Sequence, residues 1–366
     1  MKIKNLKAVD FFCGSGGMTY GLERAGIDVL AGIDVDPECK KTYEVNNPNS
    51  IFINEDIQTM NINILKKMLK IEKNDENMVF IACSPCQYWS QINTMRDKSH
   101  STKNLLIDFQ KFVSHYKPGH IIIENVPGLE KSNESILPDF LNFLKANDYN
   151  SDKDIVNAID YGVPQKRKRF LLVASRVNPG ISLPKRAEDK TLTVGHYIGE
   201  HNGFPKVPAG HKDDSDFQHT VSGLTDINVK RIKQTRKNGG TRVDWKDDPE
   251  LQVPAYIGKD NSFRDIYARM SWDKPAPTLT TRFLSYSNGR FGHPEEDRAI
   301  SIREGATLQT FPKTYKFFGK TRESIARQIG NAVPPELARR IGKSIIAQAQ
   351  KPIKISITRK NDNGKI

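Results

Sequence analysis

The first 175 residues alternate short strand-like runs with amphipathic segments of helical spacing. The runs are four or five residues long, which is a typical length for buried strands. The predicted strands are 8–12, 29–33, 50–53, 79–82, 120–124, 154–158 and 170–174, and the predicted helices are 18–25, 37–45, 62–70, 105–116 and 136–146. This alternation predicts an α/β fold with a doubly wound, mostly parallel sheet of the Rossmann-like type.

The pattern changes after Ser175. Residues 176–275 are rich in Gly, Pro, Asp, Lys and His and contain few long apolar runs, which indicates a smaller inserted domain. Regular patterns return at Pro275, with a short helix in 300–312 and two helices in 323–350. We therefore expect a catalytic domain at 1–175, the inserted domain at 176–315, C-terminal helices returning to the first domain at 316–350, and a frayed tail at 351–366.

The charge balance favours a polyanionic partner. The 366 residues carry 56 Lys and Arg against 43 Asp and Glu, a formal net charge of +13. Cations that neutralise phosphates release counterions, so this excess of positive charge would strengthen binding to a nucleic acid. Six cations lie in 229–242, either on a solvated insertion or on a surface facing nucleic acid, and we favour the second. They are Lys230, Arg231, Lys233, Arg236, Lys237 and Arg242.

Two features concern location. No apolar run reaches the roughly 18 residues of a membrane span. The first residues lack the apolar core of a signal peptide. We expect a cytoplasmic protein that does not bind membranes.

A glycine-rich turn follows the first predicted strand. Phe12 precedes Gly14, Gly16 and Gly17, and a helix begins directly afterwards. Glycines allow the tight turn, and the free N–H groups of the helix start face a bound anion. The spacing G-x-G-G fits a carboxylate-bearing cofactor better than a pyrophosphate, although a plain strand–helix turn is the alternative. Asp34 and Asp56 follow the next two strands, where carboxylates can accept ribose hydroxyls and an adenine amino group.

Four cysteines are too few and too scattered for a disulfide scaffold. Cys83 and Cys86 form a C-x-x-C, which leaves a redox pair or half a zinc site as alternatives. No helix pattern follows directly, and neither Cys13 nor Cys39 belongs to a second close pair, so we disfavour both and expect no metal.

A thiol and a carboxyl lie at the ends of two buried strands. Cys86 follows Pro85 after the run at 79–82, and Glu124 ends the run IIIEN. Ligands bind at the carboxyl ends of strands in open α/β sheets. Such a pair can attack a heteroaromatic ring and protonate it at once.

These blocks, in this order, resemble the DNA cytosine-5 methyltransferases, and the resemblance covers nearly the whole chain apart from 176–270. The block 165–169 matches the family's Q-x-R-x-R fully, and RQIGNAVPP at 327–335 resembles its final block. The resemblance implies S-adenosylmethionine as cofactor, S-adenosylhomocysteine as product and double-stranded DNA as substrate. In it, the Cys86 thiolate adds to C6 of a flipped-out cytosine, Glu124 protonates N3, and Arg169, with Arg167 nearby, holds the base. The cofactor residues would be Phe12, Gly14, Gly16, Gly17, Asp34, Val35, Asp56, Ile57, Pro85 and Asn331.

The loop after Cys86 is long and polar, and we expect it to close over DNA with contacts from Gln87, Ser90 and Arg96. Departures from the family pattern include Val35, where a bulkier apolar residue is usual. They leave the catalytic groups in place.

Several alternatives remain. An RNA cytosine methyltransferase of the same fold acts on tRNA, a catalytically silent relative binds DNA only, and a nicotinamide oxidoreductase shares the sheet. The intact Cys86, Glu124 and arginines favour a DNA methyltransferase of a restriction–modification system or a solitary regulator. We expect a monomer associated with the nucleoid, with a cognate endonuclease acting on the same site without a stable complex.

Overall fold

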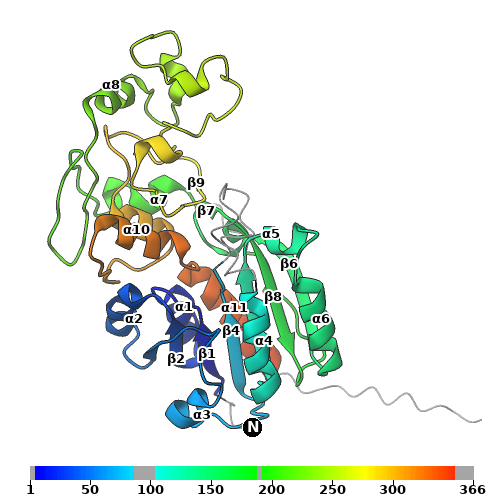
Figure 1. The fold of residues 1–366 in the computed structure, drawn as a ribbon. Coiled ribbons are helices and arrows are strands. Elements are labelled where there is room, and N and C mark those ends of the chain that lie inside the picture. Colours follow the sequence, from blue (N-terminus) through cyan, green and yellow to red (C-terminus); the bar gives the residue numbers. More distant parts are fainter. Residues whose placement is uncertain (1–4, 86–103, 188–191, 351–366) are drawn as a thin grey trace, which may run out of the picture.

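Seven strands form one sheet in the computed structural model, which describes residues 5–85, 104–187 and 192–350. The strand order is β3-β2-β1-β4-β5-β8-β6 (Figure 1). The strands are β1 Lys7–Phe11, β2 Asp28–Asp34, β3 Ile51–Asn54, β4 Met78–Ala82, β5 His120–Asn125, β6 Asn150–Asn157 and β8 Lys168–Ser175. Each predicted strand is present, and the mostly parallel α/β fold is confirmed.

One strand, β8, runs against the other six. β3, β2, β1, β4 and β5 pair in parallel, whereas β8 is antiparallel to both β5 and β6. Only ten residues, 158–167, connect β6 to β8. A parallel crossover needs about a dozen residues or more, so this short connection permits only the antiparallel pairing.

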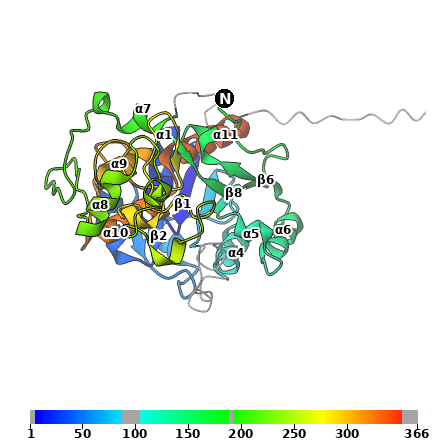
Figure 2. The same ribbon diagram turned by 90° about the horizontal axis from the view of Figure 1, so that it is seen from above.

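Both faces of the sheet are covered, because alternate residues of the same strand face opposite sides. Phe80 of β4 packs with α4 on one face, and Ile81 packs with α1 and α11 on the other. Figure 2 shows α4 and α11 on opposite sides of the strands. The helices of this part are α1 Gly17–Ala25, α2 Lys40–Asn46, α3 Ile64–Leu69, α4 Leu105–Tyr116, α5 Gly128–Lys131, α6 Leu137–Ala146 and α11 Pro335–Ala349.

The segment after β8 builds a second core with little regular structure. Its elements are α7 Val194–Ile198, α8 Asp226–Gln234, α9 Ile302–Leu308, α10 Arg322–Asn331 and the short strand β9 Ala276–Pro277, which pairs with β7 Gln165–Lys166. Irregular backbone leaves many carbonyls without ladder partners. Buried arginines supply donors: Arg269 bonds to the carbonyls of Thr235, Ile232, His293 and Glu296. Arg303 does the same for Phe217, Pro312 and Tyr315.

The two C-terminal helices pack in different places. Leu337 and Ile341 of α11 join the core that contains β1, β4 and α1. Ala326 and Ile329 of α10 instead join the second core. Both C-terminal helices therefore contact the first part of the chain, α11 through its apolar core and α10 through polar contacts such as the 3.3 Å pair of Arg327 with Glu38. No described helix is long and apolar enough to span a membrane.

Candidate active site

The glycine-rich turn links β1 to α1 at the carboxyl end of the sheet. The Cys13 N–H donates to the Ile33 carbonyl at 3.0 Å, which ties the turn to β2. Gly16 caps α1 with a left-handed φ of 84°, and Phe12 has a φ of 64°. A positive φ is uncommon for a large side chain and marks local backbone strain of the kind found at ligand sites.

The three glycines of the turn meet different surroundings. A Cβ on Gly14 would meet nothing within 4 Å, so its backbone faces open space. A Cβ on Gly16 would lie 2.5 Å from Asn47 Nδ2, and one on Gly17 would lie 2.4 Å from the Val333 carbonyl oxygen. Packing therefore explains the small residues at Gly16 and Gly17, whereas the backbone of Gly14, with a φ of 51°, borders open space.

Asp34 holds the edge of this space. Its Oδ2 accepts the Gly14 N–H at 2.8 Å and its Oδ1 accepts the Asp36 N–H at 2.9 Å. Burial raises the pKa of this carboxyl above its ordinary value, and the backbone bonds oppose the rise. A carboxylate has about four lone-pair sites, so two remain for hydroxyl donors. The neighbouring Val35 is 61% exposed, an apolar side chain that a flat ring can cover.

Other predicted cofactor residues lie around the same edge. Asp56 is half-buried in the turn after β3, where its Oδ1 accepts the Gln58 N–H at 3.0 Å, and Ile57 is buried beside it. Asn331 is exposed at the last position of α10. Asn54 was missed by the sequence analysis: its Nδ2 donates to the carbonyls of Asp34 and Val35, at 2.9 and 3.1 Å, and so fixes the loop after β2.

A carboxyl group is buried directly beneath the turn. Asp10 is fully buried in β1, and its Oδ2 accepts a 2.7 Å hydrogen bond from Thr19 Oγ1 of α1. Burial raises the pKa of Asp10 to about 7, mainly because the charged form loses its hydration. Folding therefore favours the protonated acid at this position.

The end of β5 carries an acid–cation pair. Glu124 is 7% exposed, and its Oε1 lies 3.0 Å from Nε of Arg169, which stands on β8 beside it. The antiparallel pairing of β5 with β8 brings these two residues together although they are 45 positions apart. The carboxyl and the guanidinium predicted from the sequence are thus adjacent.

The turn after β4 reaches the same edge, since Ala82 of β4 pairs with Ile123 of β5. Asn125 Nδ2 donates to Ser84 Oγ at 3.0 Å and to the Ser84 carbonyl at 3.4 Å, which fixes the backbone just before Pro85. Pro85 is exposed at the end of the described segment. Cys86, Gln87, Ser90 and Arg96 lie outside the described residues.

Arg167 differs from the expectation. It is 2% exposed, and its guanidinium donates to the Leu279 carbonyl at 3.0 Å and to the carbonyls of Gly330 and Ala332 at 3.1 and 3.4 Å. Its terminal amino groups lie where the first part of the chain meets α10. The carbonyls at the end of this helix need hydrogen-bond donors, and Arg167 supplies them. Arg167 therefore bonds to backbone carbonyls near Asn331, whereas Arg169 forms the ion pair with Glu124.

The basic run at 229–242 does not form one continuous basic surface. Arg242 is 4% exposed and donates to the carbonyls of Phe263 and Ser262, and Arg231 donates to the Leu251 carbonyl at 2.8 Å. Both therefore serve the backbone of the inserted segment, contrary to the expected DNA contacts. The remaining four are exposed, and Lys230 pairs with Glu250 at 3.5 Å. Lys233, Arg236 and Lys237 are the other three.

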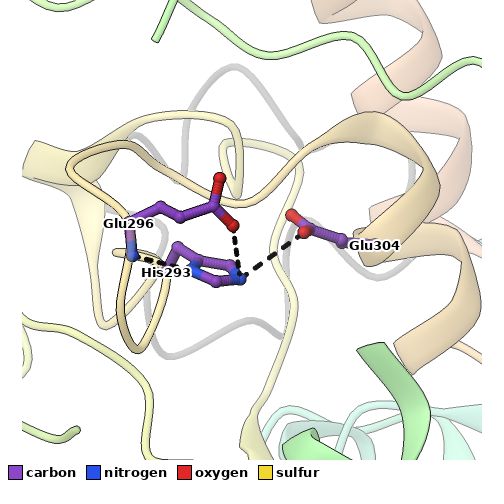
Figure 3. Close-up of side chains that lie close together, drawn as sticks. All are labelled: His293, Glu296 and Glu304. Atoms are coloured by element: carbon purple, nitrogen blue, oxygen red, sulfur yellow. Dashed lines mark hydrogen bonds and ion pairs between the residues drawn. The ribbon is translucent and has the colours of Figure 1, made fainter. Parts of the chain in front are cut away.

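A histidine and two glutamates in the second core have the spacing of a metal site (Figure 3). His293 Nδ1 accepts the Glu296 N–H at 2.9 Å and the Glu295 N–H at 3.3 Å. A neutral ring then carries its proton on Nε2, the atom that faces Glu296 and Glu304, so this nitrogen offers no lone pair to a cation. Glu304 is already paired with Arg298 by two bonds of 2.7 and 2.8 Å. This cluster is a hydrogen-bonded part of the core.

The fold of the chain is similar to that of solved methyltransferase structures. A solved E. coli protein described as a DNA modification methyltransferase encoded within a prophage matches with a TM-score of 0.73 and 24% identity, over 95% of this chain and all of that one. The structure of Spodoptera frugiperda DNMT2 matches with a TM-score of 0.60 and 16% identity, over 95% of this chain and all of that one. At these identities the likeness concerns the fold.

The sequence comparisons are more specific. The family described as C-5 cytosine-specific DNA methylase matches residues 6–347. The Type II methylase M.HgiDII of Herpetosiphon aurantiacus is 38% identical, over 92% of this chain and 94% of its own. The Type II methyltransferase M1.HphI of Haemophilus parahaemolyticus is 28% identical, over 93% and 87%. The chain belongs to the C-5 cytosine-specific DNA methylases and is a DNA (cytosine-5)-methyltransferase of the restriction–modification type.

Proposed function

We propose that the protein transfers a methyl group from S-adenosylmethionine to C5 of a cytosine flipped out of duplex DNA, through a covalent bond between Cys86 and C6. The observation that carries this proposal is the Glu124–Arg169 pair, buried at the strand end beside the turn that leads into Cys86. Family membership supplies the substrate atom, and the pair supplies an acid and a cation for one ring.

The space above β1 and β2 suits the proposed cofactor. The open backbone at Gly14 can face its amino-acid portion, the remaining lone pairs of Asp34 can accept ribose hydroxyls, and Val35 and Phe12 offer apolar surface to adenine. Asp56, Ile57, Pro85 and Asn331 complete the proposed site. When bound, S-adenosylmethionine supplies an electrophilic methyl group.

The chemistry requires help from the protein because C5 of cytosine is barely nucleophilic. Addition of the Cys86 thiolate at C6, with a proton or hydrogen bond delivered to N3 by Glu124, makes C5 an enamine carbon. Arg169 holds the Glu124 carboxyl at 3.0 Å and can also donate to the base. After C5 has taken the methyl group, loss of the C5 proton and expulsion of the thiolate restore the aromatic ring.

The substrate must leave its helix for this reaction. A thiol on a turn at a sheet edge cannot reach C6 within a stacked duplex, so the cytosine is extruded into the site. We assign DNA reading to residues 176–315, with Gln87, Ser90, Arg96 and the exposed cations Lys230, Lys233, Arg236 and Lys237 as contacts. One flipped base per turnover requires only a monomer in the cytoplasm or nucleoid, and a cognate endonuclease can act on the same site independently.

The test is a covalent trap. The protein is incubated with labelled S-adenosylmethionine and duplex DNA that carries 5-fluorocytosine, and the products are separated under denaturing conditions. Fluorine blocks the loss of a proton from C5, so the enzyme should remain bound to DNA in the wild type and not in Cys86→Ser. Transfer to DNA without any trapped adduct would contradict the covalent mechanism, and transfer to tRNA instead would overturn the DNA substrate.

A further inference from the structure

An open pocket of about 490 Å³ lies where the inserted segment meets α10. Its walls come from the segment 222–228, which leads into α8, from the segment 281–288 and from the first half of α10. Local sequence patterns do not mark this pocket, because its polar residues are scattered over more than 100 positions of the chain. We propose that the pocket holds a phosphate of the DNA backbone, with Arg282 as its principal cation. This inference rests on the proposed function.

The chemistry of the lining suits an anion. Hydroxyl and amide side chains dominate it, and these are the neutral groups that donate to phosphate oxygens. Among them are Ser222, Thr225, Asn228, Thr281, Ser285 and Asn288. Such a wall binds an anion without attracting any particular base.

Two arginines and one glutamate line the pocket. The Arg282 side chain is exposed, and within the described part of the chain no ion pair involves it. Arg327 also lines the pocket, but its guanidinium lies 3.3 Å from Glu38, and Glu323 is a single acid on the rim. Arg282 is therefore the cation that a bound phosphate would neutralise.

The helix α8 begins beside the pocket. Thr225 precedes this nine-residue helix, and its side chain accepts no hydrogen bond from the first turn. Thr225 and Asn228 both line the pocket, so the positive end of the helix borders it. Helix, hydroxyls and guanidinium thus favour the same kind of ligand.

The position fits duplex DNA rather than a free anion. The pocket joins the inserted segment, assigned to DNA reading, to α10, whose last residue is the proposed cofactor residue Asn331. A phosphate seated here would fix the register of the duplex with respect to the site where methyl transfer occurs. By contrast, Arg231 and Arg242 of the basic run are occupied by backbone carbonyls.

The test compares Arg282→Gln with Arg24→Gln, a matched change at an exposed cation of α1 that lies outside the residues assigned to DNA reading. Binding of a fluorescent duplex is measured from 50 to 300 mM salt, and S-adenosylmethionine binding is measured by calorimetry. We expect Arg282→Gln to weaken DNA binding roughly 3- to 10-fold and to reduce the slope of log K against log salt by about 0.9, the value for one phosphate. Thr281→Val should weaken binding less and leave the slope unchanged. Arg24→Gln should leave both quantities unchanged.

Three results would overturn the phosphate seat. Unchanged affinity and slope in Arg282→Gln would remove its principal cation. A loss confined to one DNA sequence would make Arg282 a base reader, and a loss of S-adenosylmethionine binding would assign the pocket to the cofactor. These failures differ from failure of the proposed function, in which the wild type itself would not methylate DNA.

Discussion

Replacing Glu124 by Gln tests the acid of the proposed mechanism with almost no change of shape. Glu124 is 7% exposed, so water has little access to replace its proton. General acid–base catalysis contributes about 10²- to 10⁴-fold to rates, which corresponds to roughly 3–5 kcal/mol of barrier. We therefore expect kcat to fall by about two to four orders of magnitude.

The same change has a structural cost. Arg169 loses its counter-charge at 3.0 Å, with side-chain exposures of 14% and 9% for the two partners. Breaking a fully buried pair costs about 3–5 kcal/mol and an exposed pair about 0–1 kcal/mol, so we expect an intermediate loss of roughly 1–3 kcal/mol. The two effects can be separated, because only the catalytic one changes turnover in fully folded protein.

The assay is single-turnover transfer of labelled methyl groups to duplex DNA at saturating cofactor, with thermal denaturation beside it. Glu130→Gln is the matched control, since Glu130 pairs with Lys153 at the surface just beyond β5. The kcat of Glu130→Gln should lie within two-fold of that of the wild type. A folded Glu124→Gln variant with kcat within three-fold of the wild type would refute Glu124 as the proton donor.

Four further predictions concern other residues of the protein. Arg169→Met should abolish most turnover with a modest loss of melting temperature, whereas Arg167→Met should lower the melting temperature by several degrees, because buried carbonyls lose donors worth about 1–3 kcal/mol each. Asp34→Asn should weaken S-adenosylmethionine binding about 10- to 100-fold in calorimetry, since hydrogen bonds to a charged group contribute about 1.5–3 kcal/mol. Asp10→Asn should flatten the pH dependence of stability between about 4 and 7 in denaturant titrations. Cys86→Ser should lose turnover in the methyl-transfer assay and retain duplex binding in the fluorescence assay.

The sign of the Asp10 effect follows from its pKa, which burial raises from 3.8 to about 7. Between these values the folded protein keeps a proton that the unfolded chain has lost. Stability therefore falls as pH rises through this window and is constant in this respect above about 7. The amide in Asp10→Asn has no titratable proton in this range. The free energy of unfolding of this variant should therefore increase relative to that of the wild type as pH rises. Parallel profiles would show that Asp10 is ionised in the folded protein.

Each of the other three predictions has a result that would contradict it. Equal melting temperatures for Arg167→Met and Arg169→Met would remove the distinction drawn from their hydrogen bonds. Unchanged cofactor affinity in Asp34→Asn would move the ribose site elsewhere. Substantial turnover in Cys86→Ser would rule out a covalent role for the thiol.

Local sequence patterns determined the strands, most of the helices and the order of the chemical groups along the chain. Short apolar runs bounded by turn residues are typical of buried strands, and glycines permit the tight turn between strand and helix. The carboxyl ends of parallel strands meet at one edge, which is why Asp34, Asp56 and Glu124 were found as site candidates.

Tertiary structure alone decided which of these side chains are free to act. Arg167 and Arg169 are alike in the sequence, but the first contacts carbonyls more than 100 positions away and the second contacts Glu124. Arg242 and Arg231 read as DNA contacts in a basic run, and packing instead placed them against the carbonyls of an irregular core. Such partners depend on long-range packing, because a buried carbonyl must find a donor wherever the fold brings one, and local periodicity carries no record of that choice.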